Sequence, residues 1–585
     1  MPLLLLLLLL LSTLLPTAVP LPPRPPVQCG GGGGAGAGCL LSNAYGAWSS
    51  DRADCSVAAV AYPVSEADVV SAVAGASAKN MPVKVVSGFA HTIPKLACPG
   101  NGSSAVPSLL ISTARYDGVA VDGVARTVTA DAGAPLRAVI DAAEASGLSL
   151  MAAPYWEGVS VGGLVSTGSH GSSWWGRGGA VHDHVVGLSL VVPTGAADGW
   201  AKVMALQKGD ALFNAAVVSL GLLGVVSKVT LALEPRFKRS ISYDYRDDST
   251  FQDDFANHAA SHQFADITWY PSQHQAVYRI DDRMPLNATG DGVNDFIGFQ
   301  STLIAVSSGI RALETALEAS RNVKGKCKMA AAEIAAKRLV GNGLRGGLLF
   351  TGYPVVGFQG RMQTSGSCAH SPSNDPLRAC PWDPRFRGLF FYESTAVFSP
   401  ARFRDFVLDV KRLRDLNPDN MCDVDAYNGL LVRFVKTSEA YLGQPEDSVV
   451  VDFNYYRASD PSSPRLNQDV WEEVEQLAFV KHGARPHWAK NRLVAFRSVQ
   501  GKYPGWAKFA GAKRQLDPRG LFDSRWSDEV VAGKDHLPKA DGCALDGRCI
   551  CSADRHCSPR KGYYCRPGLV YSEARVCRYS VSQLI

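Results

Sequence analysis

The sequence predicts an α+β protein with a cysteine-rich C-terminal tail, and three observations lead to this prediction. Strand-like and helix-like patterns alternate between residues 62 and 235. The glycines of that region gather in loops rather than at a single strand-to-helix turn. Six of the 14 cysteines lie between residues 543 and 577. With 585 residues, 46% of them hydrophobic and 19% charged, the chain can form a large core, which excludes a disordered protein.

The first segment is an unbroken leucine run, Leu3–Leu11, followed by Pro16 and small residues around Ala18. Such a run is short for a membrane span and is typical of a signal peptide, here residues 1–22. An uncleaved anchor is the alternative, and we expect no stable membrane span in the mature chain. The glycosylation triplets at Asn101 and Asn287 agree with the secretory pathway, ending outside the cell, in the cell wall or in the vacuole.

Residues 23–54 form a proline-rich and then glycine-rich segment, interpreted as a flexible linker. Cys29 and Cys39 could close its Gly30–Gly38 stretch into a small loop. These glycines resemble a dinucleotide-binding fingerprint. We discard that match because the sequence predicts no strand before them and no helix after them.

Local patterns then define the first domain. A capping box at Ser65–Asp68 begins a helix whose apolar stripe starts at Val69. A second helix begins at Pro135 and stops at Gly147, with Leu136, Val139 and Ile140 on one face. The predicted strands are Val83–Val86, Thr127–Ala130, Val185–Val192 and Val225–Leu233.

The segment Ser160–Ser173 combines glycines, hydroxyl side chains and one histidine, with no charge. As a loop, it would offer backbone N–H groups and hydroxyls to a diphosphate without using a lysine. A glycine- and serine-rich surface loop is the alternative interpretation. A second glycine set, Gly221–Gly224, precedes a valine-rich strand and could flank the same ligand.

The tail, residues 541–578, holds six cysteines among glycine, arginine, aspartate and proline, so disulfides rather than a hydrophobic core should hold it together. A zinc site is the alternative, and the sequence does not choose among the 15 possible disulfide pairings. Three units of the net charge of +5 lie between Cys543 and Cys577. The nearly neutral body argues against a nucleic-acid partner.

Five motifs in a shared order carry a resemblance to a known family. They are Val85–Thr92, Thr167–Gly171, Ser219–Val226, His487–Lys490 and Asp517–Phe522. Val57–Glu234 resembles the FAD-binding domain of the vanillyl-alcohol oxidase superfamily, and the whole body resembles its aldonolactone oxidoreductase branch. The cysteine loop and tail are similar to those of the secreted plant members of this branch, the plant-type L-gulonolactone oxidases.

This resemblance implies a fold of two large domains, where length alone allowed about three or four. Residues 55–236 would form a two-subdomain PCMH-type FAD-binding domain. Residues 237–530 would form an α+β substrate, or cap, domain with a mainly antiparallel sheet. The implied FAD-binding residues are Gly88, His91, Thr92, Gly162, Gly163, Thr167, Gly168, Ser169, His170, Gly171, Ser172, Gly221, Gly224, Val226, His487 and Lys490.

The resemblance also implies individual roles. His91 would bond covalently to the flavin, with noncovalent contact or a structural role as alternatives. Lys490 would stabilise anionic reduced flavin, unless it is a surface lysine. Arg433 would hold the substrate, although Leu431 stands where the family has a glutamate that accepts a hydrogen bond. Glu393 could supply that acceptor, or it could be a salt-bridged sheet residue.

The implied reaction is oxidation of L-gulono-1,4-lactone or a related aldonolactone at C2, by hydride transfer to flavin N5. The product would be of the ascorbate type, as in ascorbate biosynthesis, and O2 as acceptor would give hydrogen peroxide. A flavin-dependent alditol or carbohydrate oxidase and an inactive binding protein are the alternatives. The sequence implies no metal and specifies no oligomeric state.

Overall fold

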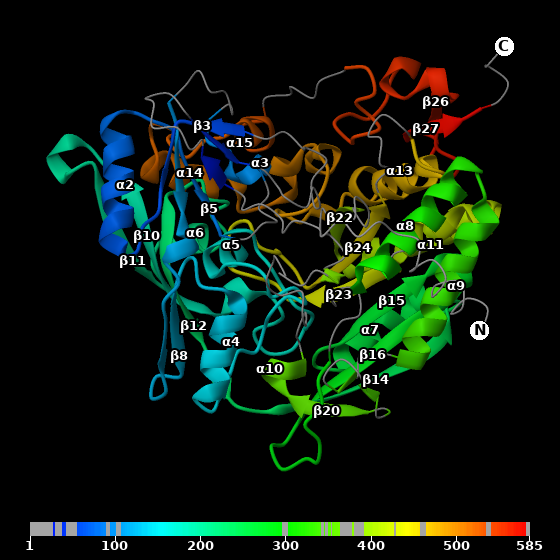
Figure 1. The fold of residues 1–585 in the computed structure, drawn as a ribbon, viewed down its shortest axis with the longest axis horizontal. Coiled ribbons are helices and arrows are strands. Elements are labelled where there is room, and N and C mark those ends of the chain that lie inside the picture. Colours follow the sequence, from blue (N-terminus) through cyan, green and yellow to red (C-terminus); the bar gives the residue numbers. More distant parts are fainter. Residues whose placement is uncertain are drawn as a thin grey trace.

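The computed structural model describes residues 27–29, 38–41, 55–88, 94–100, 107–294, 302–340, 344–345, 349–350, 352, 354–362, 377–379, 391–425, 429–456, 464–533 and 540–580. The predicted signal peptide, most of the linker, His91, Thr92 and Asn101 lie outside these residues. Figure 1 shows the N-terminal sheets on one side, the large green and yellow sheet on the other, and the red tail above α13.

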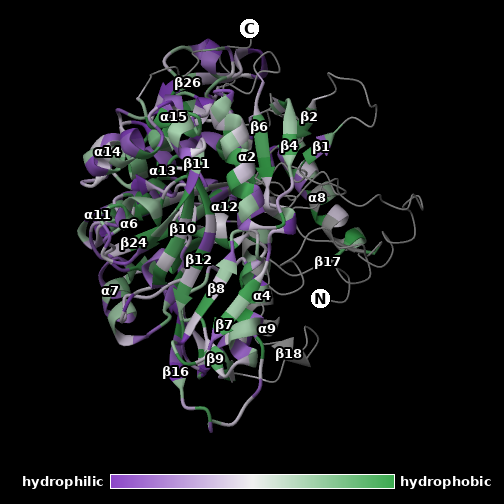
Figure 2. Cartoon of the chain, turned by 90° about the vertical axis from the view of Figure 1, so that its left-hand side faces the viewer, coloured by the Kyte–Doolittle hydropathy of each residue, from purple (hydrophilic) through white to green (hydrophobic). Residues whose placement is uncertain are grey.

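A small parallel sheet begins the body, in the order β4 (Ala59–Ala61), β6 (Leu109–Ser112), β5 (Val83–Val86). Helix α2 (Glu66–Ala78) buries Val69 and Val73 beside it. Ser65 caps α2 as predicted, but the reciprocal bond of a capping box goes elsewhere, because Asp68 accepts from the N–H of Val64 at 3.1 Å. In Figure 2, β4 and β6 are largely hydrophobic, and the central strand β6 is buried along its whole length.

The second sheet is antiparallel, and its order is β11 (Ala201–Gln207), β10 (Val185–Pro193), β12 (Val225–Ala232), β8 (Thr127–Asp131), β7 (Val119–Asp122). Its strands β8, β10 and β12 and the adjacent helix match the predicted elements closely, whereas its outer strands β7 and β11 were not predicted. Helix α4 (Leu136–Ala145) buries Leu136, Val139 and Ile140, as its periodicity predicts.

Two predictions for loops need correction. A three-residue strand, β1 (Val27–Cys29), does precede the linker glycines, and it pairs with β2 (Cys39–Leu41), where Cys29 and Cys39 form the expected disulfide. β3 (Cys55–Val57) completes this sheet, and Cys55 is bonded to Cys98. The segment 160–173 is a loop only in part, because Val161–Ser166 forms the short helix α5 with Ser160 as its N-cap.

Residues 237–530, the predicted cap domain, contain an antiparallel sheet of eight strands. Their order is β20 (Val355–Phe358), β14 (Lys238–Asp247), β16 (Gln275–Met284), β15 (Asp266–Tyr270), β23 (Leu430–Val435), β24 (Ser448–Tyr456), β22 (Phe391–Phe398), β25 (Arg485–Pro486). One face is apolar and packs on the helices α7 (Phe251–Ser261), α11 (Pro400–Leu416) and α13 (Gln468–Gln476). Because strand side chains alternate, the opposite face presents Asp266, Arg433 and Asp452 toward the N-terminal half.

Helices α8 (Ile304–Ala319) and α9 (Val323–Val340) join the cap through Lys326, which pairs with Glu314 and Asp423. Cys327 is disulfide-bonded to Cys422 at the start of α12 (Cys422–Asp425). No helix within the described ranges is long and apolar enough to cross a membrane. Further helices are α3 (Pro94–Ala97), α6 (Phe213–Ala216), α10 (Gln359–Met362), α14 (Trp506–Leu516) and α15 (Arg525–Val530). Further strands are β9 (Leu148–Ser149), β13 (Glu234–Pro235), β17 (Thr302–Leu303), β18 (Leu344–Arg345), β19 (Leu349–Phe350) and β21 (Arg378–Ala379).

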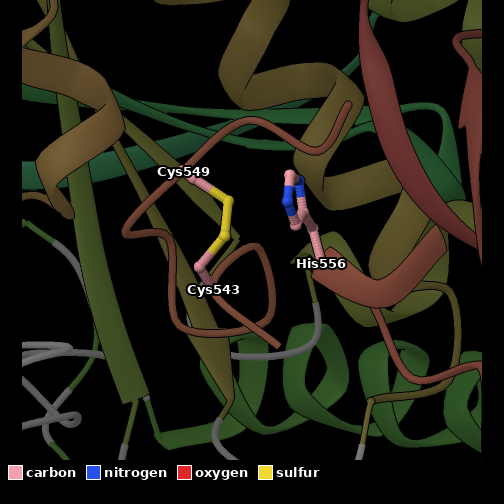
Figure 3. Close-up of side chains that lie close together, drawn as sticks. All are labelled: Cys543, Cys549 and His556. Atoms are coloured by element: carbon pink, nitrogen blue, oxygen red, sulfur yellow. A yellow bond between two sulfur atoms is a disulfide. The ribbon is translucent and has the colours of Figure 1, made fainter. Parts of the chain in front are cut away.

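The tail folds around three disulfides and a two-stranded ribbon, β26 (Tyr563–Pro567) and β27 (Arg575–Tyr579). The pairs are Cys543–Cys549, Cys551–Cys565 and Cys557–Cys577. His556 lies beside the first pair (Figure 3), where three such side chains would suit a metal. Because both sulfur atoms are bonded to each other, the disulfide interpretation of the tail is confirmed over zinc.

Candidate active site and cofactor cavity

A cavity of about 230 Å³ opens between the small parallel sheet that contains β5 and the antiparallel sheet that contains β12. Its wall includes the end of β5, the α5 segment and the turn before β12. The cavity brings together these residues predicted to bind FAD: Gly162, Gly163, Thr167, Ser169, Gly221, Gly224 and Val226. Ala489, the residue before Lys490, also lines it, so the His487–Lys490 motif reaches this cavity from the cap side.

Two glycines allow backbones to approach each other closely around the cavity. A Cβ atom on Gly162 would lie 2.9 Å from the Cβ of Ala132, so no larger residue fits between α5 and the strand beside it. Gly224 has φ of +148° and a Cβ there would lie 2.5 Å from the carbonyl oxygen of Val191. Glycine is therefore required at both positions for the cavity wall to close.

Lys84 is a cavity residue that the sequence analysis missed. It lies on β5, and its ammonium donates to the carbonyl of Gly221 at 3.0 Å. Burial lowers the pKa of Lys84 to about 7, although Asp523 and Asp517 act in the opposite direction. An anion bound beside Lys84 would favour its ammonium form. The cavity therefore offers a lysine to a diphosphate, although the sequence predicted a diphosphate held without one.

Beside the cavity, a buried ion cluster joins three strands of the cap sheet to the His487–Lys490 motif. Asp452 on β24 pairs with Arg433 on β23, and its other oxygen lies 3.2 Å from the ammonium of Lys490. The hydroxyl of Thr395 on β22 donates to the same oxygen as Lys490. Burial opposes the charged carboxylate, but Arg433 and Lys490 hold the pKa of Asp452 well below its ordinary value.

Two histidines lie against this cluster, with ring centroids 5.4 Å apart. His170 donates from Nδ1 to the carbonyl of Gly171 at 2.8 Å, and its buried Nε2 has no hydrogen-bond partner among the described residues. Burial and then repulsion from Arg433 lower the pKa of His170 to about 3. Burial and then Lys490 lower the pKa of His487 well below its ordinary value. Both rings are therefore neutral at pH 7.

The remaining predicted residues lie away from the cavity wall or outside the described residues. Ser172 connects the domains, because its hydroxyl donates to Ala265 and accepts from the N–H of Phe434. Gly171 packs so closely that a Cβ would lie 2.6 Å from the carbonyl of Ala153, and Gly168 adjoins Trp488. The following predicted residues complete the set: Gly88 abuts Ala114 after β5, Glu393 pairs with Asn454 in the cap sheet through its backbone, and His91 and Thr92 are not described.

The cavity fits FAD in chemistry. Most of its wall is aliphatic, as a flat ring system requires, while hydroxyls of Ser160, Thr167 and Ser169 and the Lys84 ammonium suit a ribityl diphosphate. The unpartnered Nε2 of His170 and the cations Arg433 and Lys490 belong to the neighbouring cluster and could bind polar groups of a substrate. When bound, FAD would supply the two-electron acceptor for such a substrate.

Comparison with known proteins agrees with this geometry. A family model for an FAD binding domain matches residues 57–197, and a model for D-arabinono-1,4-lactone oxidase matches residues 412–530. A model for the L-gulonolactone oxidase 2-like C-terminal domain matches residues 540–579. Among solved structures, a solvent-stable cholesterol oxidase shares the fold, with a TM-score of 0.63 at 16% identity, covering 84% of this chain and 97% of its own.

The fold and the cavity define an FAD-dependent oxidoreductase. L-gulonolactone oxidase 3 of Arabidopsis thaliana is 56% identical over 97% of this chain and 96% of its own length. L-gulonolactone oxidase 5 of the same plant is 43% identical over 96% and 95%. The mouse L-gulonolactone oxidase is 25% identical over 80% and 94%. The chain belongs to the L-gulonolactone oxidase family.

Proposed function

We propose that this enzyme oxidises L-gulono-1,4-lactone, or a closely related aldonolactone, at C2 to an ascorbate-type product, with O2 as acceptor and hydrogen peroxide as second product. The observation that carries the proposal is the Arg433–Asp452–Lys490 cluster beside the FAD cavity. The names of the plant relatives support the same substrate class.

The residues of the site have complementary tasks. Arg433 donates hydrogen bonds to the lactone oxygens, and the positive charge of Lys490 would stabilise the anionic reduced flavin that follows oxidation. The neutral His170 offers Nε2 as an acceptor for the C2 hydroxyl. Trp488 is buried, stacks on Tyr503 at 4.9 Å and donates to the carbonyl of Leu442, so it seals the wall behind the motif against water. Glu393 remains a predicted substrate residue.

Anaerobic reduction of the bound flavin tests the proposal. We expect L-gulono-1,4-lactone to bleach the flavin absorption under nitrogen faster than L-galactono-1,4-lactone or xylitol does. Admission of air should restore the spectrum and release hydrogen peroxide. Bleaching by xylitol alone would replace the proposal with an alditol oxidase, and a spectrum that no lactone changes would contradict it.

We propose covalent attachment of FAD through His91, because this residue follows Ser87, which lines the cavity, by four positions in the sequence. Acid precipitation of the protein should then leave the yellow flavin in the pellet. The His91→Ala variant should release it to the supernatant. Release of flavin from the unaltered protein would contradict covalent attachment and show that FAD is bound noncovalently.

We propose that the chain enters the secretory pathway. The described disulfides and the exposed Asn287 within its glycosylation triplet support this route. In plant cells, the protein should begin near residue 18 to 23 and lose mass on treatment with an endoglycosidase. The Asn287→Gln variant should lose less mass. A protein that keeps Leu3–Leu11 and carries no glycan would contradict the route.

A further inference from the structure

Asp452 occupies a distinctive place in the register of the cap sheet. It lies directly opposite Leu431 on β23 and opposite Thr395 on β22. Residues directly opposite each other in antiparallel strands have Cβ atoms about 5 Å apart on the same face. The carboxylate of Asp452 thus reaches the position that an acidic side chain at residue 431 would occupy beside Arg433.

The carboxylate of Asp452 contacts the predicted substrate-binding cation and the predicted flavin-binding cation. One oxygen pairs with Arg433, and the other accepts from Thr395 and lies 3.2 Å from Lys490. Arg433 also donates to the carbonyl of His170 at 3.3 Å. Asp452 therefore fixes the positions of two cations, Arg433 and Lys490, that come from different parts of the chain. Through Arg433 it also fixes the position of the neutral His170.

We propose that Asp452 is a positioning residue that replaces, from the neighbouring strand, the carboxylate absent at Leu431, and that it orients Arg433 toward the lactone and holds Lys490 beside it. This inference rests on the proposed lactone oxidation. With both of its oxygens engaged and its charge fixed by two cations, Asp452 does not act as the proton acceptor.

The Asp452→Asn variant tests this role, since it keeps the side-chain shape and removes the charge. We expect kcat/KM for the lactone to fall about tenfold or more, chiefly through KM. The net charge of the cluster rises from +1 to +2, so the reduction potential of the bound flavin should rise. The double variant Leu431→Glu/Asp452→Asn returns a carboxylate to the same face and should recover both quantities in part.

The matched control is Asp248→Asn. Asp248 is an equally buried carboxylate directly after β14 of the same sheet, and it pairs with Arg414 and accepts from the indole N–H of Trp269 in the apolar core. This variant should lose thermal stability but keep the KM and the flavin potential. Equal effects of the two single variants, or no recovery in the double variant, would overturn the inference.

The two readouts separate this inference from the proposed function. If no lactone reduces the unaltered enzyme, lactone oxidation fails, and the flavin potential of Asp452→Asn still reports on the role of the carboxylate. If the lactone reduces the enzyme while Asp452→Asn keeps the unaltered KM and potential, the proposed function holds and the positioning role is refuted.

Discussion

Lys84 is the only charged side chain among the described residues that line the cofactor cavity. Its exposed fraction is 2%, and burial lowers its pKa to about 7. A diphosphate beside it would restore the ammonium form, so FAD binding at a pH above 7 must take up a proton. Below about pH 7 the lysine is already charged, and the full attraction is available.

We predict that Lys84→Met weakens FAD binding about 10- to 100-fold, the usual effect of losing a hydrogen bond to a charged group. FAD affinity should also fall as the pH rises above 7 in protein with Lys84, and should stay constant in the variant. Fluorescence titration in the His91→Ala background, where FAD can exchange, measures both. Equal pH profiles for the two proteins would show that Lys84 does not face the diphosphate.

The residues of the cavity and of the ion cluster beside it differ in how far the sequence alone can reveal them. The Gly/Ser segment and the Gly221–Gly224 turn were predicted to bind the cofactor because their composition is itself the signal. Lys84 lies in an ordinary strand, Val83–Val86, and Asp452 lies in the apolar β24. Their importance depends on pairing between distant strands, which no local pattern in a single sequence records.

Helix α13 joins the catalytic cap to the tail, although its charged sequence gave no sign of burial on all sides. Val470 and Val474 enter the cap core, while Glu473 accepts from the N–H groups of Leu569 and Val570, each at 2.6 Å. Glu472 accepts from the N–H of Cys577 at 2.7 Å. Buried carboxylates that cap the backbone of another segment in this way fix its position.

Burial raises the pKa of Glu472 to about 7, whereas a glutamate in the unfolded chain has a pKa of about 4.3. The native state therefore holds an extra proton between these values, and stability falls as the pH rises from about 4.3 to 7. We predict that Glu472→Gln removes this pH dependence, worth on the order of 3 kcal/mol, from thermal melting. The exposed Glu573→Gln is the control and should keep it. An unchanged profile in Glu472→Gln would contradict the assignment.

The helices and strands also differ in how well local sequence patterns predict them. The periodicity of α4 and the valine-rich patterns of β10 and β12 gave elements within a residue or two of those observed. α5 was missed because Gly162 and Gly163 are poor helix formers. Its helix exists because Ser160 caps it and because the close approach to Ala132 tolerates only glycine at residue 162.

At the scale of the whole molecule, the tail lies against the same loop that carries Lys490. The N–H of Val494 donates to the carbonyl of Gly547 at 3.2 Å, and the guanidinium of Arg492 lies against Gly547. Arg492 is held from the other side by Glu475 of α13 and by the face of Trp471 at 4.6 Å. The tail therefore supports a segment that begins two residues after a predicted catalytic lysine.

Gly547 allows a direct test of this support. Its φ is +65°, and a Cβ there would overlap the guanidinium of Arg492, which its partners keep from moving aside. We predict that Gly547→Ala lowers kcat/KM for the lactone about tenfold while flavin content stays unchanged, because displacement of Arg492 reaches Lys490 through Asn491. Gly542→Ala is the matched control, since its φ is +73° and its Cβ would meet nothing within 4 Å. Both variants bear the same backbone strain, so a difference in kinetics isolates the contact with Arg492, and identical kinetics would show that the tail acts on stability alone.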